Sequence, residues 1–219
     1  MKFLPTTKEE MKNLGWDSID VLLISGDTYL DTSYNGSALV GKWLVEHGFK
    51  VGIIAQPEVD VPDDITRLGE PNLFFAVSGG CVDSMVANYT ATKKRRQQDD
   101  FTPGGVNNKR PDRAVLVYSN MIRRFFKGTT KKIVISGIES SLRRITHYDY
   151  WTNKLRKPIL FDAKADILSY GMGEMSMLQL ANALKNGEDW QNIRGLCYLS
   201  KEPKEDYLSL PSHSECLAD

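Results

Sequence analysis

The sequence predicts an α/β fold in which a doubly wound, mostly parallel sheet lies between two layers of helices. Three observations predict this class. Short apolar runs without polar alternation recur along the chain, as in strands that are buried on both faces. Segments with helical spacing separate these runs, which is the order of a parallel sheet with crossover helices. Most runs end close to a glycine, which permits a tight turn into the next helix.

The five principal strands are predicted from continuous apolar runs at residues 21–25, 50–55, 73–77, 132–136 and 165–170. A helix at 37–48 follows the first strand, because Asn35 or Ser37 can cap it and Gly48 can end it. A short helix or turn is expected at 63–69, and a helix that begins near Val82 follows the third strand.

The second half of the chain continues this alternation. Pro111 suits the first turn of a helix that extends to Phe126 with an apolar stripe. A helix is expected at 174–184, a short edge or connecting strand at 159–161, and a final edge strand at 192–199. We therefore expect one flavodoxin-like, three-layer α/β domain over residues 1–199, followed by a polar linker at 200–219.

Composition narrows the classes of function. The chain has 28 Lys plus Arg and 28 Asp plus Glu, so its net charge gives no reason to expect a nucleic acid or a membrane as partner. The basic run at residues 93–96 is more typical of a solvated face. No apolar run approaches the roughly 18 residues of a membrane span, and the N-terminus lacks a secretory signal. Three scattered cysteines argue against disulfides and a metal site, which indicates a cytoplasmic protein.

Polar, glycine-containing clusters follow four of the predicted strands. Because ligands bind beyond the carboxyl ends of parallel strands, these clusters should converge on one rim that binds a ligand or another domain. We assign no catalytic residue and no metal ligand. The candidate rim residues are Asp27, Tyr29 and Asp31 after the first strand, Ser78, Gly79, Arg95 and Arg96 after the third, Glu139, Ser140, Arg143, Arg144, His147, Tyr148, Asp149 and Tyr150 after the fourth, and Gly171, Gly173 and Glu174 after the fifth.

The cluster after the fourth strand, GIESSLRRITHYDYW, has two interpretations. Arg143 and Arg144 can hold a carboxylate or phosphate in a forked geometry. Glu139 and Asp149 can instead satisfy those arginines in a structural ion-pair network. A hydrolase or transferase that uses His147 with either carboxylate is a further alternative, but no nucleophile with an adjacent base is recognisable. The glycine pairs also lack the G-x-G-x-x-G spacing of a dinucleotide site.

Long motifs occur at residues 3–31, 52–58, 71–96, 102–114, 137–151 and 163–174. In sequence and order they resemble the N-terminal region of YgiQ-type radical SAM proteins. The resemblance implies a longer protein in which a radical S-adenosylmethionine barrel follows the linker. In that barrel a CxxxCxxC motif, which this chain lacks, binds a 4Fe–4S cluster that cleaves S-adenosylmethionine. The chain would then be an accessory domain that shapes or covers the active site and is not catalytic alone.

The same region resembles the cobalamin-binding-like α/β domain that precedes other radical SAM barrels. The cobalamin motif D-x-H-x-x-G places a histidine after the first strand, where this chain reads GDTYLDTSYNG. The resemblance therefore does not extend to a histidine ligand for cobalamin. A module that binds a cobalamin-like or anionic small molecule is the alternative to a purely accessory domain.

Overall fold

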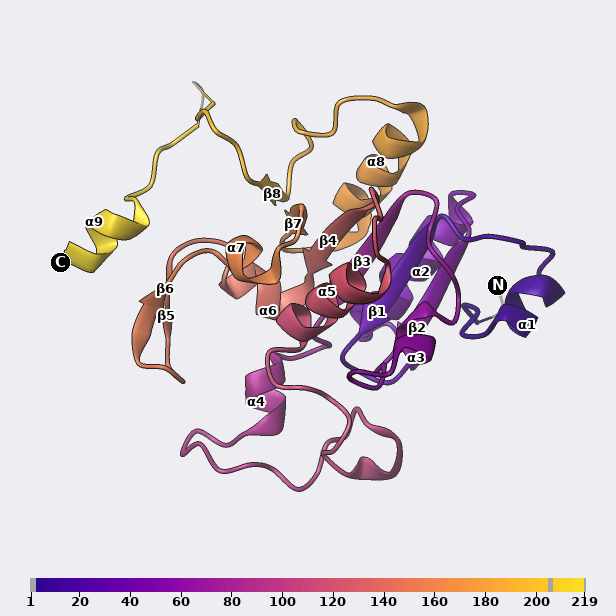
Figure 1. Ribbon diagram of the computed structural model, residues 1–219, viewed down its shortest axis with the longest axis horizontal. Coiled ribbons are helices and arrows are strands. Elements are labelled where there is room, and N and C mark those ends of the chain that lie inside the picture. Colours follow the sequence, from indigo (N-terminus) through magenta and orange to yellow (C-terminus); the bar gives the residue numbers. More distant parts are fainter. Residues whose placement is uncertain (1–2, 205–206, 219) are drawn as a thin grey trace.

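The sheet has six strands, which confirms the predicted α/β class (Figure 1). The structure is a computed structural model that describes residues 3–204 and 207–218. The strand order is β2-β1-β3-β4-β7-β8. The first five of these strands are parallel, and β8 pairs antiparallel with β7. The strands are β1 (Val21–Ser25), β2 (Val51–Ala55), β3 (Phe74–Ser78), β4 (Lys132–Ser136), β7 (Ile167–Ser169) and β8 (Leu196–Tyr198).

The chain changes its winding direction between β1 and β3. From β1 it moves outward to β2, then returns to β3 on the other side of β1 and continues outward to β4 and β7. This is the flavodoxin-like order, as predicted. Because the connections leave β1 and β3 in opposite directions, a crevice forms beyond their carboxyl ends, where doubly wound proteins bind ligands.

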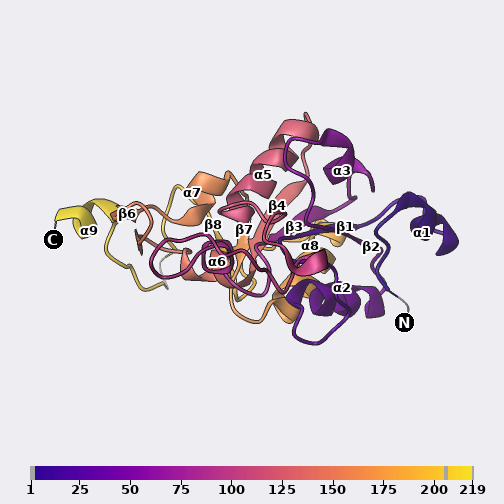
Figure 2. The ribbon, with the colours of Figure 1, turned by 90° about the horizontal axis from the view of Figure 1, so that it is seen from below.

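Helices cover both faces of the sheet (Figure 2). The side chains of β1 point alternately to the two faces and are buried on both. Leu22 and Ile24 belong to one core cluster, and Val21 and Leu23 belong to the other. Burial of each such side chain contributes about 1.5–3 kcal/mol, so the apolar strands stabilise both layers. The helices on the two faces are α2 (Gly36–Glu46) and α8 (Gly173–Asn186) on one, and α3 (Pro62–Thr66), α5 (Ala114–Phe125) and α7 (Ile159–Ala163) on the other.

The other central elements gather at the carboxyl ends of the strands. They are α4 (Ser84–Asn88), α6 (Gly137–Leu142) and a hairpin of β5 (His147–Asp149) and β6 (Lys154–Arg156). The polar loop 90–110 contains one short 3-10 helix, Pro103–Gly105. Figure 1 shows α4 and this loop at the bottom of the view, and the hairpin to their left. At the far right lies α1 (Lys8–Asn13).

Some predicted elements require correction. Residues 159–161 were predicted as a strand, but they begin helix α7, because Ile159, Leu160 and Ala163 form one buried helical face. The helix predicted from Pro111 begins only at Ala114, after Arg113 adopts a left-handed conformation with φ of 54°. A helix that was not predicted, α9 (His213–Ala218), lies in the polar segment expected as a linker. Within residues 3–204 and 207–218, no helix has the length and apolar character needed to cross a membrane.

Candidate functional site

Four neighbouring strands each end in a serine. Ser25, Ser78, Ser136 and Ser169 end β1, β3, β4 and β7. The strand register aligns Ser25 with Ser78, and Ser78 with Ser136. The hydroxyl groups therefore form a row along the carboxyl edge of the sheet. Of these four serines the sequence analysis named only Ser78, although each of them closes an apolar run and could have been recognised.

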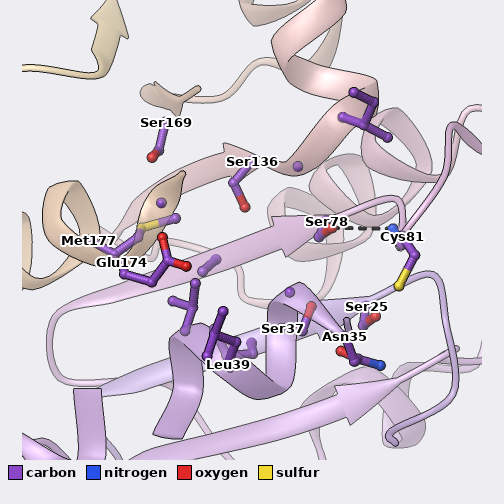
Figure 3. Close-up of a pocket in the computed structure, with 18 of the residues that line it drawn as sticks. Ser25, Asn35, Ser37, Leu39, Ser78, Cys81, Ser136, Ser169, Glu174 and Met177 are labelled. Carbon is purple, nitrogen blue, oxygen red and sulfur yellow. Dashed lines mark hydrogen bonds between the residues drawn. The ribbon is translucent and has the colours of Figure 1, made fainter. Parts of the chain in front are cut away.

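The serine row lines a cavity of about 310 Å³, at the crevice that the winding order predicts (Figure 3). Ser25 and Ser169 are buried, whereas Tyr34, Ile138 and Met172 around the cavity are exposed. The cavity thus has hydroxyl groups at its base and an apolar mouth. Apolar side chains of the sheet and of α2 and α8 form its walls: Leu23, Leu39, Val40, Ala76 and Met177.

Two helices begin at this cavity, since the first residues of α2 and α8 line it. Free N–H groups at a helix N-terminus favour acceptor groups and negative charge. At α2 the side chain of Asn35 accepts a hydrogen bond from the N–H of Ala38 at 3.1 Å, whereas no side chain caps α8. Among the described residues that line the cavity none is cationic, so its donors are neutral groups: hydroxyls, backbone N–H groups, the Asn35 amide and the Cys81 thiol.

Asp27, at the end of β1, is a buried carboxylate beside the cavity. Its Oδ1 accepts from Arg110 Nη2 at 2.6 Å, and its Oδ2 accepts from the N–H of Cys81 at 2.6 Å. Burial raises the pKa of Asp27, while the charge of Arg110 and the bond from Cys81 oppose that rise. Asp27 is therefore engaged within the protein and is a structural anchor for the cavity.

The long polar loop supplies Arg110, which sequence reasoning missed. Besides Asp27, Arg110 contacts Asp99 at 3.3 Å and donates from Nε to the carbonyl of Gly26 at 2.9 Å. The N–H of Thr28 donates to the carbonyl of Phe101 at 2.8 Å, which ties the loop to the segment after β1. The loop therefore folds back over the carboxyl edge of the sheet as an ordered structure.

Glu139 holds the starts of two helices together from the interior. Its Oε2 accepts from the N–H of Ser84 at 2.9 Å, and its Oε1 accepts from the N–H of Val115 at 3.3 Å. These groups lie at the first turns of α4 and α5. Burial raises the pKa of Glu139, and the neighbouring charge of Asp83 raises it further. The structure places Glu139 and the buried Ser140 inside the domain, where they do not form an exposed rim.

The arginines around GIESSLRRITHYDYW find partners that the sequence did not indicate. Arg143 pairs with the carboxylate of Asp83. The buried Asp149 accepts from Arg113 Nη2 at 2.8 Å and also from Thr152. Burial favours a higher pKa for Asp149, but the bonds from Thr152 and Arg113 outweigh it and lower the pKa to about 2. Ion pairs within the protein thus account for Arg143 and Asp149.

The predicted rim residues do not all lie at one place. Asp27, Ser78, Gly171, Gly173 and Glu174 line the cavity together. Gly79 packs so closely on Gly26 that a Cβ on Gly26 would lie 2.2 Å from the Gly79 carbonyl oxygen.

The remaining predicted residues lie around the cavity or away from it. The hydroxyl of Tyr29 accepts from the N–H of Leu4 at 2.9 Å, and Asp31 pairs with Lys42 at 2.5 Å. Arg144 stacks on the ring of Tyr170 at 5.2 Å. The loop and the hairpin carry Arg95, Arg96, Tyr148 and Tyr150.

His147 does not form a catalytic pair with either suggested carboxylate in the described structure. Its Nδ1 lies 3.2 Å from the carbonyl of Ile145, while both oxygens of Glu139 and the Oδ2 of Asp149 accept from the partners named above. The cavity that His147 and Glu139 share is about 10 Å³, roughly the space of one water molecule. Burial lowers the pKa of His147. Nothing in this geometry supports a hydrolase centred on His147.

The cysteines do not fit an iron–sulfur cluster. Cys81 follows β3, Cys197 lies in β8 and Cys216 in α9. Over residues 3–204 and 207–218, no group of three or more Cys, His, Asp or Glu side chains could hold a metal ion. Burial, with the nearby carboxylate of Asp27, raises the pKa of Cys81 to about 12, so its thiol stays protonated.

Comparison with known sequences identifies longer relatives. A UPF0313 protein of Fusobacterium nucleatum subsp. nucleatum is 98% identical over 219 residues, which are 100% of this chain and 39% of that protein. A UPF0313 protein of Thermotoga neapolitana is 54% identical over 216 residues, covering 97% of this chain and 38% of that protein. The chain thus spans about two fifths of the length of these curated relatives.

Comparison with solved structures supports the fold. The radical S-adenosylmethionine methyltransferase TsrM from Kitasatospora setae, with cobalamin and a 4Fe–4S cluster bound, matches with a TM-score of 0.56 and 18% identity. The match covers 84% of this chain and 28% of TsrM. In sequence, the family described as Radical SAM N-terminal matches residues 3–219. The chain therefore belongs to the Radical SAM N-terminal family.

Proposed function

We propose that this chain is the accessory domain of a radical SAM enzyme and that its carboxyl edge faces a barrel downstream. The observation that carries the proposal is an apolar surface beside that edge, on a domain that spans 39% of a near-identical relative. Ile138 and Leu142 of α6, with Met172 and Met175 at the start of α8, are exposed. Exposed apolar patches commonly mark interaction sites. In this proposal the barrel covers these side chains.

The proposal divides the chain as the sequence suggests. Residues 1–199 form the accessory domain, and residues 200–219 lead toward the barrel. The protein works in the cytoplasm, where the thiols of its three free cysteines stay reduced. The barrel, not this chain, supplies the cluster ligands and binds S-adenosylmethionine, since the cysteines here lie on separate elements.

Reductive cleavage of S-adenosylmethionine tests this division of labour. After anaerobic reconstitution with iron and sulfide and reduction with dithionite, the chain alone should form no 5′-deoxyadenosine. A longer protein that carries this chain should form it under the same conditions. Cleavage by the chain alone at the rate of the longer protein would contradict the proposal.

The cavity favours a second function, the binding of a small molecule. The TsrM structure holds cobalamin, and this chain has the same fold with a cavity at the carboxyl ends of its strands. No histidine is among the described residues that line the cavity, so a corrinoid would bind here without a histidine ligand. The apolar mouth suits a flat macrocycle, and the hydroxyl row suits polar substituents of the same ligand.

Titration with hydroxocobalamin, followed by visible absorbance and calorimetry, tests this second function. Ser136→Leu, which fills the cavity, should abolish binding. Ser200→Leu, on an exposed segment away from the cavity, should leave binding unchanged. Absence of both a spectral change and heat with the unaltered chain would exclude cobalamin as the ligand.

A further inference from the structure

A second exposed cluster lies outside the cavity, where residues 89–96 meet the β5–β6 hairpin. We name it the basic–aromatic ladder. Its rings and cations follow one another: Arg95 lies 5.7 Å from the Tyr89 ring, which lies 5.0 Å from the Trp151 ring. Next, Trp151 lies 5.7 Å from Tyr150, over which the Nζ of Lys93 lies at 4.7 Å. The complete ladder is Tyr89, Lys93, Lys94, Arg95, Arg96, Tyr148, Tyr150, Trp151 and Lys154.

Hydrogen bonds fix the two segments of the ladder to each other. The hydroxyl of Tyr150 donates to the carbonyl of Ala91 at 2.7 Å, and the Nζ of Lys93 donates to the carbonyl of Trp151 at 3.4 Å. Residues 90–94 form a tight turn, in which the N–H of Thr90 donates to the carbonyl of Lys94 at 2.8 Å. The basic run and the aromatic run, far apart in the sequence, are thus held in one arrangement.

The ladder concentrates positive charge in a chain whose net charge is zero. In the part of the chain that the structure describes, Lys93, Lys94 and Lys154 have no carboxylate within 4.0 Å, and Arg95 has only Asp112, at 3.7 Å. The nearby Asp149 is buried and paired with Arg113, so it does not offset this charge. The sequence showed the basic run at residues 93–96, but not that it lies beside the aromatic side chains of the hairpin.

Two tyrosines present open aromatic surface beside these cations. Tyr148 and Tyr150 flank the buried Asp149 and are 58% and 49% exposed. Tyr148 lies in β5, where its hydroxyl donates to Asn153 at 2.7 Å, and Tyr150 follows directly after β5, so the hairpin carries both rings. Rings of this kind, exposed beside cations, offer flat faces on which a partner can stack.

We propose that the basic–aromatic ladder binds single-stranded nucleic acid. Lysine and arginine side chains neutralise phosphates, and unpaired bases stack on aromatic rings. Duplex nucleic acid keeps its bases stacked on one another, and an acidic protein surface would engage the cations but not the two rings. The combination of exposed rings with Lys93, Lys94 and Lys154, which have no carboxylate partner in the described structure, therefore favours a single strand. This inference does not depend on the accessory role proposed above.

Fluorescence anisotropy with labelled oligo-uridine and oligo-thymidine, each added to this chain, tests the proposal and compares RNA with DNA. For about four neutralised phosphates, the logarithm of affinity should fall against the logarithm of salt concentration with a slope of about −3. Tyr150→Leu should weaken binding about tenfold, because stacking is lost. Tyr150→Phe keeps the ring and loses only the hydroxyl bond to Ala91, so it should bind more tightly than Tyr150→Leu.

Matched charge variants locate the surface. Lys94→Gln with Lys154→Gln removes two exposed ladder cations and should reduce the magnitude of the salt slope by about 1.4. Lys8→Gln with Lys12→Gln removes two exposed cations on the distant α1 and should leave it unchanged (Figure 1). Circular dichroism checks that every variant is folded.

Several results would overturn the proposal. They are no anisotropy change with either oligonucleotide, equal binding by Tyr150→Leu and the unaltered chain, and binding of duplex DNA or heparin as tight as that of the single strands. Loss of binding when the barrel is present in the longer protein would also overturn it, because the ladder would then be a surface between domains.

Discussion

Arg110 and Asp27 form an ion pair within the protein interior: Nη2 lies 2.6 Å from Oδ1, and the two side chains are 0% and 1% exposed. The pair joins the end of the long polar loop to the end of β1, beside the cavity. A buried pair of this kind depends on both partners, because either charge alone in the interior is strongly unfavourable. It therefore fixes the loop over the carboxyl edge of the sheet.

Replacing Arg110 with methionine should lower the free energy of unfolding by about 3–5 kcal/mol, because Asp27 keeps a buried charge without its partner. Urea unfolding followed by circular dichroism measures this change. The double variant Arg110→Met with Asp27→Asn should recover part of the loss.

Arg124→Met is the matched control for that prediction. Arg124 pairs with Asp60 on the surface, and such pairs contribute about 0–1 kcal/mol. Equal destabilisation by Arg110→Met and Arg124→Met would show that the buried pair does not hold the loop.

Glu139→Ala should destabilise the fold by about 2–4 kcal/mol. The substitution leaves the N–H groups of Ser84 and Val115 buried without an acceptor, and each such group costs about 1–3 kcal/mol. Thermal and urea unfolding measure the loss. Glu46→Ala, on the exposed end of α2, should stay within about 0.5 kcal/mol. Wild-type stability of Glu139→Ala would refute its capping role.

Gly26→Ala should destabilise the protein by about 1–3 kcal/mol, because the new Cβ would lie 2.2 Å from the backbone oxygen of Gly79. The two strand ends would have to separate, so the cavity should also change shape. Gly36→Ala is the control, since a Cβ there meets nothing within 4 Å. Melting temperatures of the two variants test this prediction. Similar values would contradict the close approach of Gly26 to Gly79.

The ion pair of Asp149 should make stability fall in acid. Asp149 has a pKa of about 2 in the folded protein, against about 3.9 in an unfolded chain. The folded state therefore gains stability above about pH 4, up to about 2.6 kcal/mol, and loses it as the pH falls toward 2. Asp149→Asn should flatten this part of the pH profile of urea unfolding. An unchanged acid slope in that variant would exclude Asp149 as its source.

The strands could be predicted because burial on both faces leaves an unbroken apolar run, as in Val21–Ser25. The short helix α7 could not, since three apolar residues in a row fit a strand or a buried helical turn equally well. The hairpin and α9 bury little apolar surface, so their sequences show no clear hydrophobic periodicity from which they could be predicted. Contacts between residues far apart in the sequence could not be predicted either. Arg110 and Asp27 are separated by 83 positions, and Glu139 and Ser84 by 55.

The cavity lies beyond the carboxyl ends of the strands, and its lining residues differ in part from the rim that the sequence predicts. Because ligands bind beyond the carboxyl ends of parallel strands, Asp27, Ser78 and the glycines after β7 were predicted on the rim, and all of them line the cavity. Charged residues drew more attention than serines, although the serines line the cavity. Glu139 was placed on a rim because nothing local shows that its carboxylate accepts from two helix N-termini.

Methionine oxidation tests the central claim, that a downstream barrel covers the carboxyl edge. Met172, which directly precedes α8, is 84% exposed in this chain, whereas Met177 within α8 is 1% exposed and serves as the internal control. Under dilute hydrogen peroxide, mass spectrometry should find rapid sulfoxide formation at Met172 in this chain and strong protection in the longer protein. Equal oxidation of Met172 in both proteins, with Met177 protected throughout, would contradict the account.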